Sequence, residues 1–416
     1  LQVDINLLSS LLHWRIQPNK IDITGAHFVI HQLKNNQFQL NALLTKAIDM
    51  DESTSAFDNK FLMSWISEQQ FLSLSDSTID FYSVHGDLLQ SSIHALSLTN
   101  NGDTHFLSGD FTLFKKIPAH IRIAATLEGT LENYQKEKIQ LYFDLQNFQW
   151  HQSNYHPAFY GNELNKGLFN GQVWIDVNNL QIQSVQSVFR LSEATLVSTL
   201  AKEPLNIKFL SGNLFWQRED HGWQFSGDQV QLETGNKVWQ ENNFTFIIDQ
   251  NGEHPLQQLW IHYLNIHDIR QLLLSSSFNI PEKIRHLAES LKSDGDLTNF
   301  YISHQDNSAN QNSFRVATQF NDFSLSRWQD IPGVSGLSGY LDISQDQGDI
   351  TINSKDVTID FGSLFSKPLF AEFLSGQIHW LREEDGQWKL YARNVEAVNQ
   401  AMAVYGNMGL IIPKDG

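Results

Sequence analysis

Hydrophobic and polar residues alternate along most of this chain. Residues 138–150 show the pattern most strictly, with apolar side chains at Ile139, Leu141, Phe143 and Leu145. Residues 347–361 contain two shorter runs of the same kind. A period of two places side chains of one kind on one face of a β-strand. The pattern therefore predicts half-buried strands at both places.

Turn-forming residues separate these runs. The segment 71–113 has turn signals at His85-Gly86 and at Asn100-Asn101-Gly102, and further strands follow in 119–131, 138–150 and 205–249. Spacing of about 8–12 residues between turn signals is typical of continuous antiparallel sheet. We expect a mainly β chain. The alternation does not separate a closed sandwich core from a curved sheet whose apolar face is open.

Two segments interrupt the strand pattern. Residues 59–70 have the apolar spacing of a short helix. Residues 268–292 are predicted to be helical, because Pro281 suits a first helical turn and one face collects Ile284, Leu287, Ala288 and Leu291.

A glycine-centred string recurs at irregular intervals. FLSGNLFW at 209–216 and FLSGQIHW at 373–380 are its closest copies, and its glycines are Gly109, Gly171, Gly212, Gly339 and Gly376. The irregular intervals exclude a fixed-period solenoid. We interpret these glycines as strand starts that mark a bend or bulge, because backbone shape explains strand glycines more often than ligand contact does.

Composition narrows the functional classes. The chain has 416 residues, which predicts two to three domains if it is compact. Its 28 Lys and Arg against 46 Asp and Glu give a net charge of -18, which argues against nucleic acid and against electrostatic docking on anionic membranes. It contains no cysteine and no apolar run long enough to span a bilayer. Because it begins at Leu1, we expect a fragment that lacks its targeting segment.

Catalytic and metal-binding patterns are weak. His27 and His31 are four residues apart, which in a strand is about 13 Å and too far to share one ion. The acidic stretches 218–220 and 382–385 follow the two FLSG strings and precede Gly and Trp, which is typical of hairpin turns. No nucleophile elbow, phosphate loop or dinucleotide fingerprint is present. We expect no enzyme activity, no cofactor and no metal. The alternative of a β-rich carbohydrate-active enzyme is supported only by the aromatic residues and by carboxylates that form no identifiable catalytic pair.

Longer strings carry a family resemblance. They are PGVSGLSGYL (332–341), SKDVTIDFGSLFSKPL (354–369) and FLSGQIHW (373–380), with helix-then-strand segment 268–302 and lead-in 321–334 before them. In this order they resemble the YhdP branch of the AsmA-like family, Gram-negative envelope proteins related to TamB. Residues 3–44 resemble the AsmA-type segment that follows the membrane anchor, whereas 45–165 is less diagnostic.

The resemblance implies a fold and a function. It implies an elongated, twisted antiparallel β-sheet that curves into an apolar groove, with a few short helices. The expected parts are an AsmA-type segment (1–44) after a missing membrane anchor, a β-groove part (45–267), a helical connector (268–297) and a second β-groove part (298–416) truncated at its C-terminus. The expected protein is a periplasmic fragment of an inner-membrane-anchored, bridge-like transporter that moves phospholipid between inner and outer membrane.

The implied partners are phospholipid acyl chains, the inner membrane through the missing N-terminal helix, and outer-membrane or other envelope proteins. The residues that we expect to line the groove, chosen by alternation, are Phe314, Val316, Phe320, Ile350, Ile352, Val357, Ile359 and Phe361. The alternative is an envelope-spanning scaffold or tether that conducts no lipid and whose apolar face is plugged by helices such as 281–292.

Overall fold

The structure, a computed structural model, consists almost entirely of β-strands. It describes residues 2–5, 18–32, 38–42, 66–84, 86, 88–113, 117–149, 158–159, 162–198, 204–235, 237–250, 255–275, 286, 289–305, 313–328, 332–362, 365, 367–383 and 385–413.

The strands follow one another along the chain as the alternation predicts. The N-terminal strands are β1 (Gln2–Ile5), β2 (Pro18–Thr24), β3 (His27–Gln32), β4 (Phe38–Ala42), β5 (Phe71–Tyr82), β6 (Leu88–Asn101), β7 (Thr104–Leu113), β8 (Ala119–Glu128) and β9 (Lys138–Gln149). The central strands are β10 (Ala158–Phe159), β11 (Asn162–Asn178), β12 (Gln181–Ser198), β13 (Leu205–Glu219), β14 (Gly222–Thr234), β15 (Lys237–Val238), β16 (Asn242–Asp249) and β17 (Leu256–Asn265). The C-terminal strands are β18 (Asp294–Gln305), β19 (Ser313–Leu325), β20 (Gly333–Ser344), β21 (Gln347–Asp360), β22 (Leu369–Arg382), β23 (Trp388–Val398) and β24 (Ala403–Ile412).

All these strands form one sheet, and from β5 to the C-terminus each strand pairs antiparallel with the next long strand along the chain; the two-residue strands β10 and β15 pair only with β11 and β14. The N-terminal end departs from the continuous antiparallel sheet that the turn spacing predicts. Strands β2 and β3 both pair parallel with β5, β2 along its first half and β3 along its second. A parallel pair needs a long connection, and residues 43–70 supply it.

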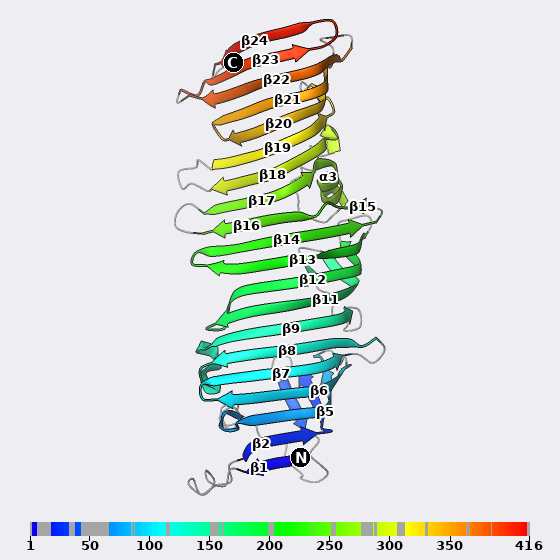
Figure 1. The fold of residues 1–416 in the computed structure, drawn as a ribbon, viewed down its shortest axis with the longest axis vertical. Helices are drawn as coiled ribbons and strands as arrows, with labels where there is room; N and C mark the ends of the chain where they lie inside the picture. The colour runs from blue at the N-terminus through cyan, green and yellow to red at the C-terminus, as the bar shows by residue number, and fades with distance from the viewer. Residues whose placement is uncertain are drawn as a thin grey trace.

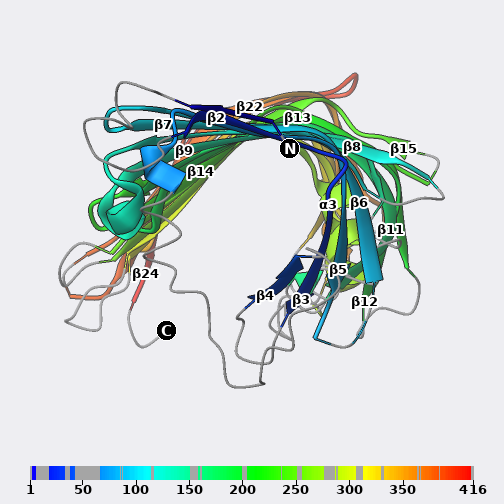
Figure 2. The ribbon, with the colours of Figure 1, turned by 90° about the horizontal axis from the view of Figure 1, so that it is seen from below.

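The sheet is long and curved. Its two chain ends lie at opposite ends of the molecule (Figure 1), and seen along its length it forms a trough that is open on one side (Figure 2). The accessible surface is 27250 Å², against roughly 16,400 Å² for a compact monomer of 47.7 kDa. Among the described residues, only nine hydrophobic side chains are buried. The predicted fold class is confirmed, and a closed sandwich core is excluded.

Helices are few in the described part of the chain. They are the 3₁₀ helix η1 (Leu131–Lys136), α3 (Ile266–Ser275), and helical residues at 66–68, 286 and 289–291. Helix α3 begins two residues before the predicted position because Asn265 caps it, its side-chain Oδ1 accepting the N–H of Asp268 at 3.1 Å. Most of the predicted helices 59–70 and 281–292 lies outside the described residues.

A line of β-bulges crosses the sheet. In eight strands a polar residue inside the strand has φ between +47° and +58°; these residues are Asp76, Asn147, Glu193, Gln229, Asn299, Asp322, Asp356 and Asn394. Asn and Asp tolerate this left-handed conformation better than most residues. A bulge bends its strand and increases the local twist. The bulges therefore contribute to the curvature of the trough.

Side chains from the next strand satisfy several bulged N–H groups. Each of these N–H groups donates to a side-chain oxygen, in the pairs Asn147 to Asn170 (2.9 Å), Gln229 to Asn243 (2.8 Å), Asp322 to Ser338 (3.1 Å) and Asn394 to Asn407 (2.8 Å). A bulge removes a residue from the regular ladder, so its N–H needs such a partner.

The recurring glycines lie inside strands and not at their starts. Gly212 is inside β13 and Gly376 inside β22, because these strands begin earlier than the strings indicate. Both stand at register shifts against the next strand, where the extra residue belongs to that strand: Gly212 faces the bulge at Gln229 of β14, and Gly376 faces the bulge at Asn394 of β23. These glycines therefore mark bulges of the neighbouring strands. At Gly339 a side chain would collide with the carbonyl oxygen of Thr351 on the neighbouring strand. Backbone packing explains these glycines without a ligand.

Candidate functional site: an apolar face along the whole sheet

Directly paired residues on neighbouring strands point to the same face of a sheet. Following these pairs from β1 to β24 gives one continuous line of residues, here called the first row. It contains one residue from each full-length strand that it crosses: Val3, Ile21, Leu72, Leu98, Leu107, Ala125, Leu141, Ile175, Val185, Trp216, Phe225, Phe246, Leu259, Ile302, Val316, Ile343, Gly348, Trp380, Leu390 and Leu410. Every member is apolar or glycine.

Gly348 is the one member of the first row that has no side chain, and an apolar group covers it. A side chain there would collide with the indole ring of Trp380, its partner on β22. The ring thus fills the place that the glycine leaves open. The apolar surface is continuous across this position.

A second row runs beside the first, two residues along each strand. From β2 to β18 it contains Ile23, Leu74, Leu96, Gly109, Ile123, Phe143, Val173, Ser187, Leu214, Gly227, Phe244, Ile261 and Phe300. From β19 it continues through Thr318, Leu341, Ile350, Ile378, Ala392 and Met408. The two rows form a band on one side of the sheet, here called the apolar face.

The opposite face carries a mostly polar line of residues beside the first row, and its next line includes the aromatic residues Tyr142, Trp174 and Phe215. From β8 to β20 the line next to the first row contains Thr126, Gln140, Asp176, Ser184, Gln217, Gln224, Ile247, Gln258, Ser303, Arg315 and Ser344. Its members bond to one another: Asp176 accepts from Ser184 at 2.6 Å and from Gln140 at 3.0 Å. These bonds lower the pKa of Asp176, that from Ser184 most. This line has the composition of a solvated surface.

The bulges keep the apolar residues of each strand on one face. In β21, Ile352 and Val357 are five residues apart, and strict alternation would place them on opposite faces. The bulge at Asp356 adds one residue and reverses the alternation. The bulge at Asp322 stands at the same phase break, between Phe320 and Phe323. This break is the sequence signal for the bulge.

The predicted groove residues fall at several places on this face. Val316 belongs to the first row and Ile350 to the second. Phe320 and Ile352 are both paired with Gly339. On the far side of the bulge, Ile359 pairs with Val334 and Leu369, and Val357 pairs with Ala371 and is fully buried.

The other two predicted residues lie at the margins. Phe314 pairs with His304 at the start of β19 and is 43% exposed. Phe361 follows the end of β21, and its ring centroid lies 5.6 Å from that of Phe365. The sequence did not reveal most of the first row. The candidates were chosen by alternation within residues 314–361, and the alternation of one strand does not show how it is aligned with its neighbours.

Residues weighed for metal or acid-base chemistry have structural partners. His27 Nε2 lies 3.0 Å from Asp80 Oδ2, and the His31 ring stacks on Tyr82 at 4.8 Å. His379 Nδ1 lies 2.8 Å from Asp349 Oδ1. The acidic stretches close the hairpins β13–β14 and β22–β23, as predicted. The described residues contain no group of His, Asp and Glu that could hold a metal.

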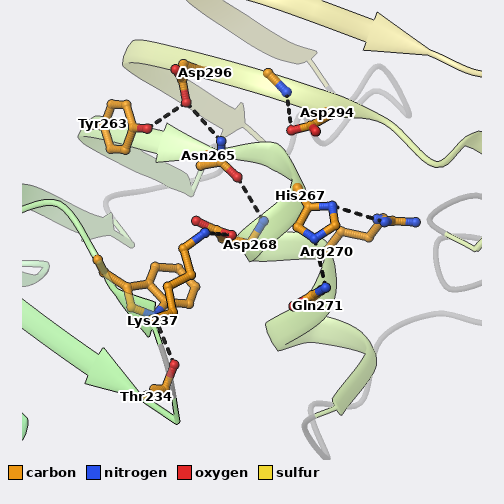
Figure 3. Close-up of polar contacts among 12 residues, drawn as sticks. Thr234, Lys237, Tyr263, Asn265, His267, Asp268, Arg270, Gln271, Asp294 and Asp296 are labelled. Carbon is orange, nitrogen blue, oxygen red and sulfur yellow. Dashed lines mark hydrogen bonds and ion pairs between the residues drawn. The ribbon is translucent and has the colours of Figure 1, made fainter.

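A pocket with polar and apolar walls lies at the margin of the sheet, between α3, β15, the start of β16 and the end of β17; Figure 3 shows the polar contacts around it. It encloses about 260 Å³ and is lined by Lys237, Trp239, Asn242, Tyr263, Leu264 and Asp268 among others. The Lys237 ammonium pairs with the Asp268 carboxylate. Nothing in the sequence indicated this pocket, because its walls come from three strands and a helix.

The comparisons with known proteins bear on this architecture. The family model described as YhdP protein matches residues 1–416, the whole chain. The chain belongs to the YhdP family. One curated YhdP relative is the intermembrane phospholipid transporter YhdP of Escherichia coli (strain K12), which is 22% identical over 431 residues. That match covers 98% of this chain and 31% of the relative, so the chain spans about a third of that relative's length.

No solved structure gives a significant match to this chain. The family resemblance noted from the sequence strings is confirmed. Among the described helices of this YhdP-family chain, none is long and apolar enough to cross a membrane.

Proposed function

We propose that this chain forms a section of a conduit for phospholipid, with acyl chains lying against the apolar face and headgroups at the opening of the trough. The observation that carries the proposal is the first row, which is apolar on every strand that it crosses. The name of the Escherichia coli relative supports phospholipid as the cargo. No catalytic step is part of this function.

Differences in exposure support placing the apolar face inside the trough. Side chains converge on the inside of a curved sheet and spread apart on its outside. First-row residues from Leu72 to Leu390 are all buried or half-buried. On the polar face, Trp174, Val188 and Tyr340 are more exposed, at 38%, 44% and 45%, whereas Tyr142, Phe215 and Trp260 are half-buried.

The energetics favour such a surface as a path for lipid. Moving a 16-carbon acyl chain into water costs about 13 kcal/mol, at about 0.8 kcal/mol per methylene. The first row crosses twenty strands, and at about 4.8 Å per strand it is about 90 Å long. Apolar contacts are non-directional, so an acyl chain can shift from strand to strand without breaking specific bonds.

The cellular setting belongs to the same proposal. We place the chain in the periplasm, as part of a longer protein that an N-terminal helix anchors in the inner membrane and that passes phospholipid toward the outer membrane. Outer-membrane or other envelope proteins are the expected partners at the far end.

Photo-crosslinking in cells tests the proposal. A crosslinking amino acid at Ile352 or Ile359 is expected to capture phospholipid. The matched controls are Thr351 and Thr358, their neighbours on the same strand, which pair with residues of the polar face. Equal capture at all four positions, or capture at the threonines alone, would overturn the groove assignment. Absence of lipid at all four would favour the scaffold or tether.

A further inference from the structure

The pocket beside α3 contains a charge pair of unequal exposure. The side chain of Asp268 is 6% exposed, whereas that of Lys237 is 48% exposed. In the part of the chain that the structure describes, Lys237 is the one partner of the Asp268 carboxylate. A buried carboxylate is costly without a counter-charge. Whatever displaces Lys237 must therefore supply a positive charge of its own.

Further groups around the pocket present aromatic surface and fixed donors (Figure 3). The Lys237 ammonium lies 5.8 Å from the centroid of the Trp239 ring. The Tyr263 hydroxyl donates to Asp296 at 2.6 Å, and Asn265 donates to the same oxygen at 2.9 Å. Burial and this carboxylate raise the pKa of Tyr263 to about 12, so its hydroxyl remains protonated at neutral pH.

The pocket adjoins the apolar face. Its wall includes Leu264, which pairs with Leu297 on β18, and Leu297 pairs with Phe320 on β19. A molecule with its polar end in the pocket therefore has apolar surface next to it for a hydrocarbon tail. Lys237 stands on the two-residue strand β15 at the margin of the sheet (Figure 1).

We propose that this pocket binds the headgroup of a phospholipid that carries both a phosphate and a primary ammonium group. Lys237 pairs with the phosphate and Asp268 with the ammonium, so one internal ion pair is exchanged for two and neither charge is left unpaired. This inference rests on the proposed function, because the acyl chains of the same lipid lie on the apolar face.

Other headgroups fit this pair less well. A phosphate with an uncharged glycerol headgroup engages Lys237 but leaves the Asp268 carboxylate buried without a counter-charge. A quaternary ammonium has no N–H to donate to that carboxylate. The primary ammonium is the headgroup cation that satisfies both the charge and the hydrogen bonding of Asp268.

Binding of short-chain lipids to the purified chain tests the proposal. The probes are dihexanoyl phosphatidylethanolamine, phosphatidylglycerol and phosphatidylcholine, with O-phosphoethanolamine and inorganic phosphate as ligands without tails. We expect the ethanolamine lipid to bind at least tenfold more tightly than the glycerol lipid. The variant Asp268→Asn is expected to lose this preference while it retains the glycerol lipid.

A second ion pair on the same sheet provides the control. Lys208 and Glu233 are 3.2 Å apart on β13 and β14, and neither lines the pocket. The variant Glu233→Gln is expected to keep the full headgroup preference. Both variants must show the circular dichroism of the wild type. If Asp268→Asn does not fold, acetylation of Lys237 in the wild type replaces it, read by peptide mass spectrometry with Lys208 as reference. The ethanolamine lipid should protect Lys237 at a concentration at least tenfold lower than the glycerol lipid, and equal protection by both would overturn the proposal.

The outcomes separate this proposal from the proposed function. Lipid binding without headgroup preference, or a preference that survives Asp268→Asn, overturns the pocket and leaves the conduit intact. Inorganic phosphate that binds as tightly as O-phosphoethanolamine identifies a simple anion site and also overturns the proposal. Absence of binding by every lipid contradicts the conduit itself.

Discussion

One pair of substitutions in β12 tests whether the first row is the path of the lipid. Val185 belongs to the first row, between Ile175 and Trp216 on the neighbouring strands. Val188 stands three residues away on the polar face, between Gln172 and Asn213. Val185→Asp and Val188→Asp therefore make the same chemical change on one strand, at opposite faces.

The magnitude follows from the spacing of the strands. An aspartate at 185 keeps water around it and interrupts the row over about 5 Å, one strand spacing. A 16-carbon chain spans about half of a 30 Å hydrocarbon core, so about five methylenes lie over the gap. At about 0.8 kcal/mol each, crossing costs about 4 kcal/mol, which corresponds to roughly 1000-fold slower passage. Val188→Asp is expected to change the rate less than twofold.

In the assay, each variant is the only version of the full-length protein in the cell. The measured quantity is the rate at which pulse-labelled phospholipid reaches the outer membrane. Protein levels and thermal unfolding are compared first, so that loss of fold is separated from loss of transport. A folded Val185→Asp protein with normal transport would refute the apolar row as the path. Equal loss in both variants would show that strand stability, and not the apolar face, controls the rate.

Three further predictions concern stability, each measured by denaturant unfolding. Asn243→Ala leaves the bulged N–H of β14 without its side-chain acceptor and should lower the free energy of unfolding by about 1 kcal/mol, whereas Asn243→Asp should retain most of it. Gly339→Val should cost more than 2 kcal/mol, since its side chain would meet a backbone carbonyl of β21; a smaller loss would show that the strands can separate there. Hydrogen bonds from Arg315 lower the pKa of Asp342, so this pair stabilises the fold above the ordinary carboxyl pKa of 3.8 and the effect is lost as pH falls through the lowered value. Asp342→Asn should therefore cost at most about 1 kcal/mol at pH 7, for an exposed pair, and nothing at the acid end; a cost independent of pH would contradict this account.

Much of the fold is written locally in the sequence. Alternation places strands at 119–128 and 138–149 almost residue by residue, and turn residues place the hairpins between them. Local sequence succeeds here because each strand of an antiparallel sheet pairs with its chain neighbour. It fails at β2 and β3, whose parallel partner β5 is about fifty residues away.

The candidate site was only partly predictable for a related reason. The sequence placed Val316 and Ile350 on strands and gave both runs of β21 an apolar character. It did not show that Asp356 is a bulge that returns the second run to the same face. The pocket was hidden as well, because Lys237 and Asp268 are 31 residues apart and meet only through β15 and α3.

The sequence by itself determined which residues form strands and which side of each strand is apolar. It also showed which family the chain resembles. Only the tertiary structure decided that these sides join into one row from Val3 to Leu410 and that no second layer of described residues covers it as a core. The physical reason is that alternation fixes side-chain direction within one strand, whereas register, bulges and curvature are relations between strands, set by hydrogen bonds that no single segment encodes.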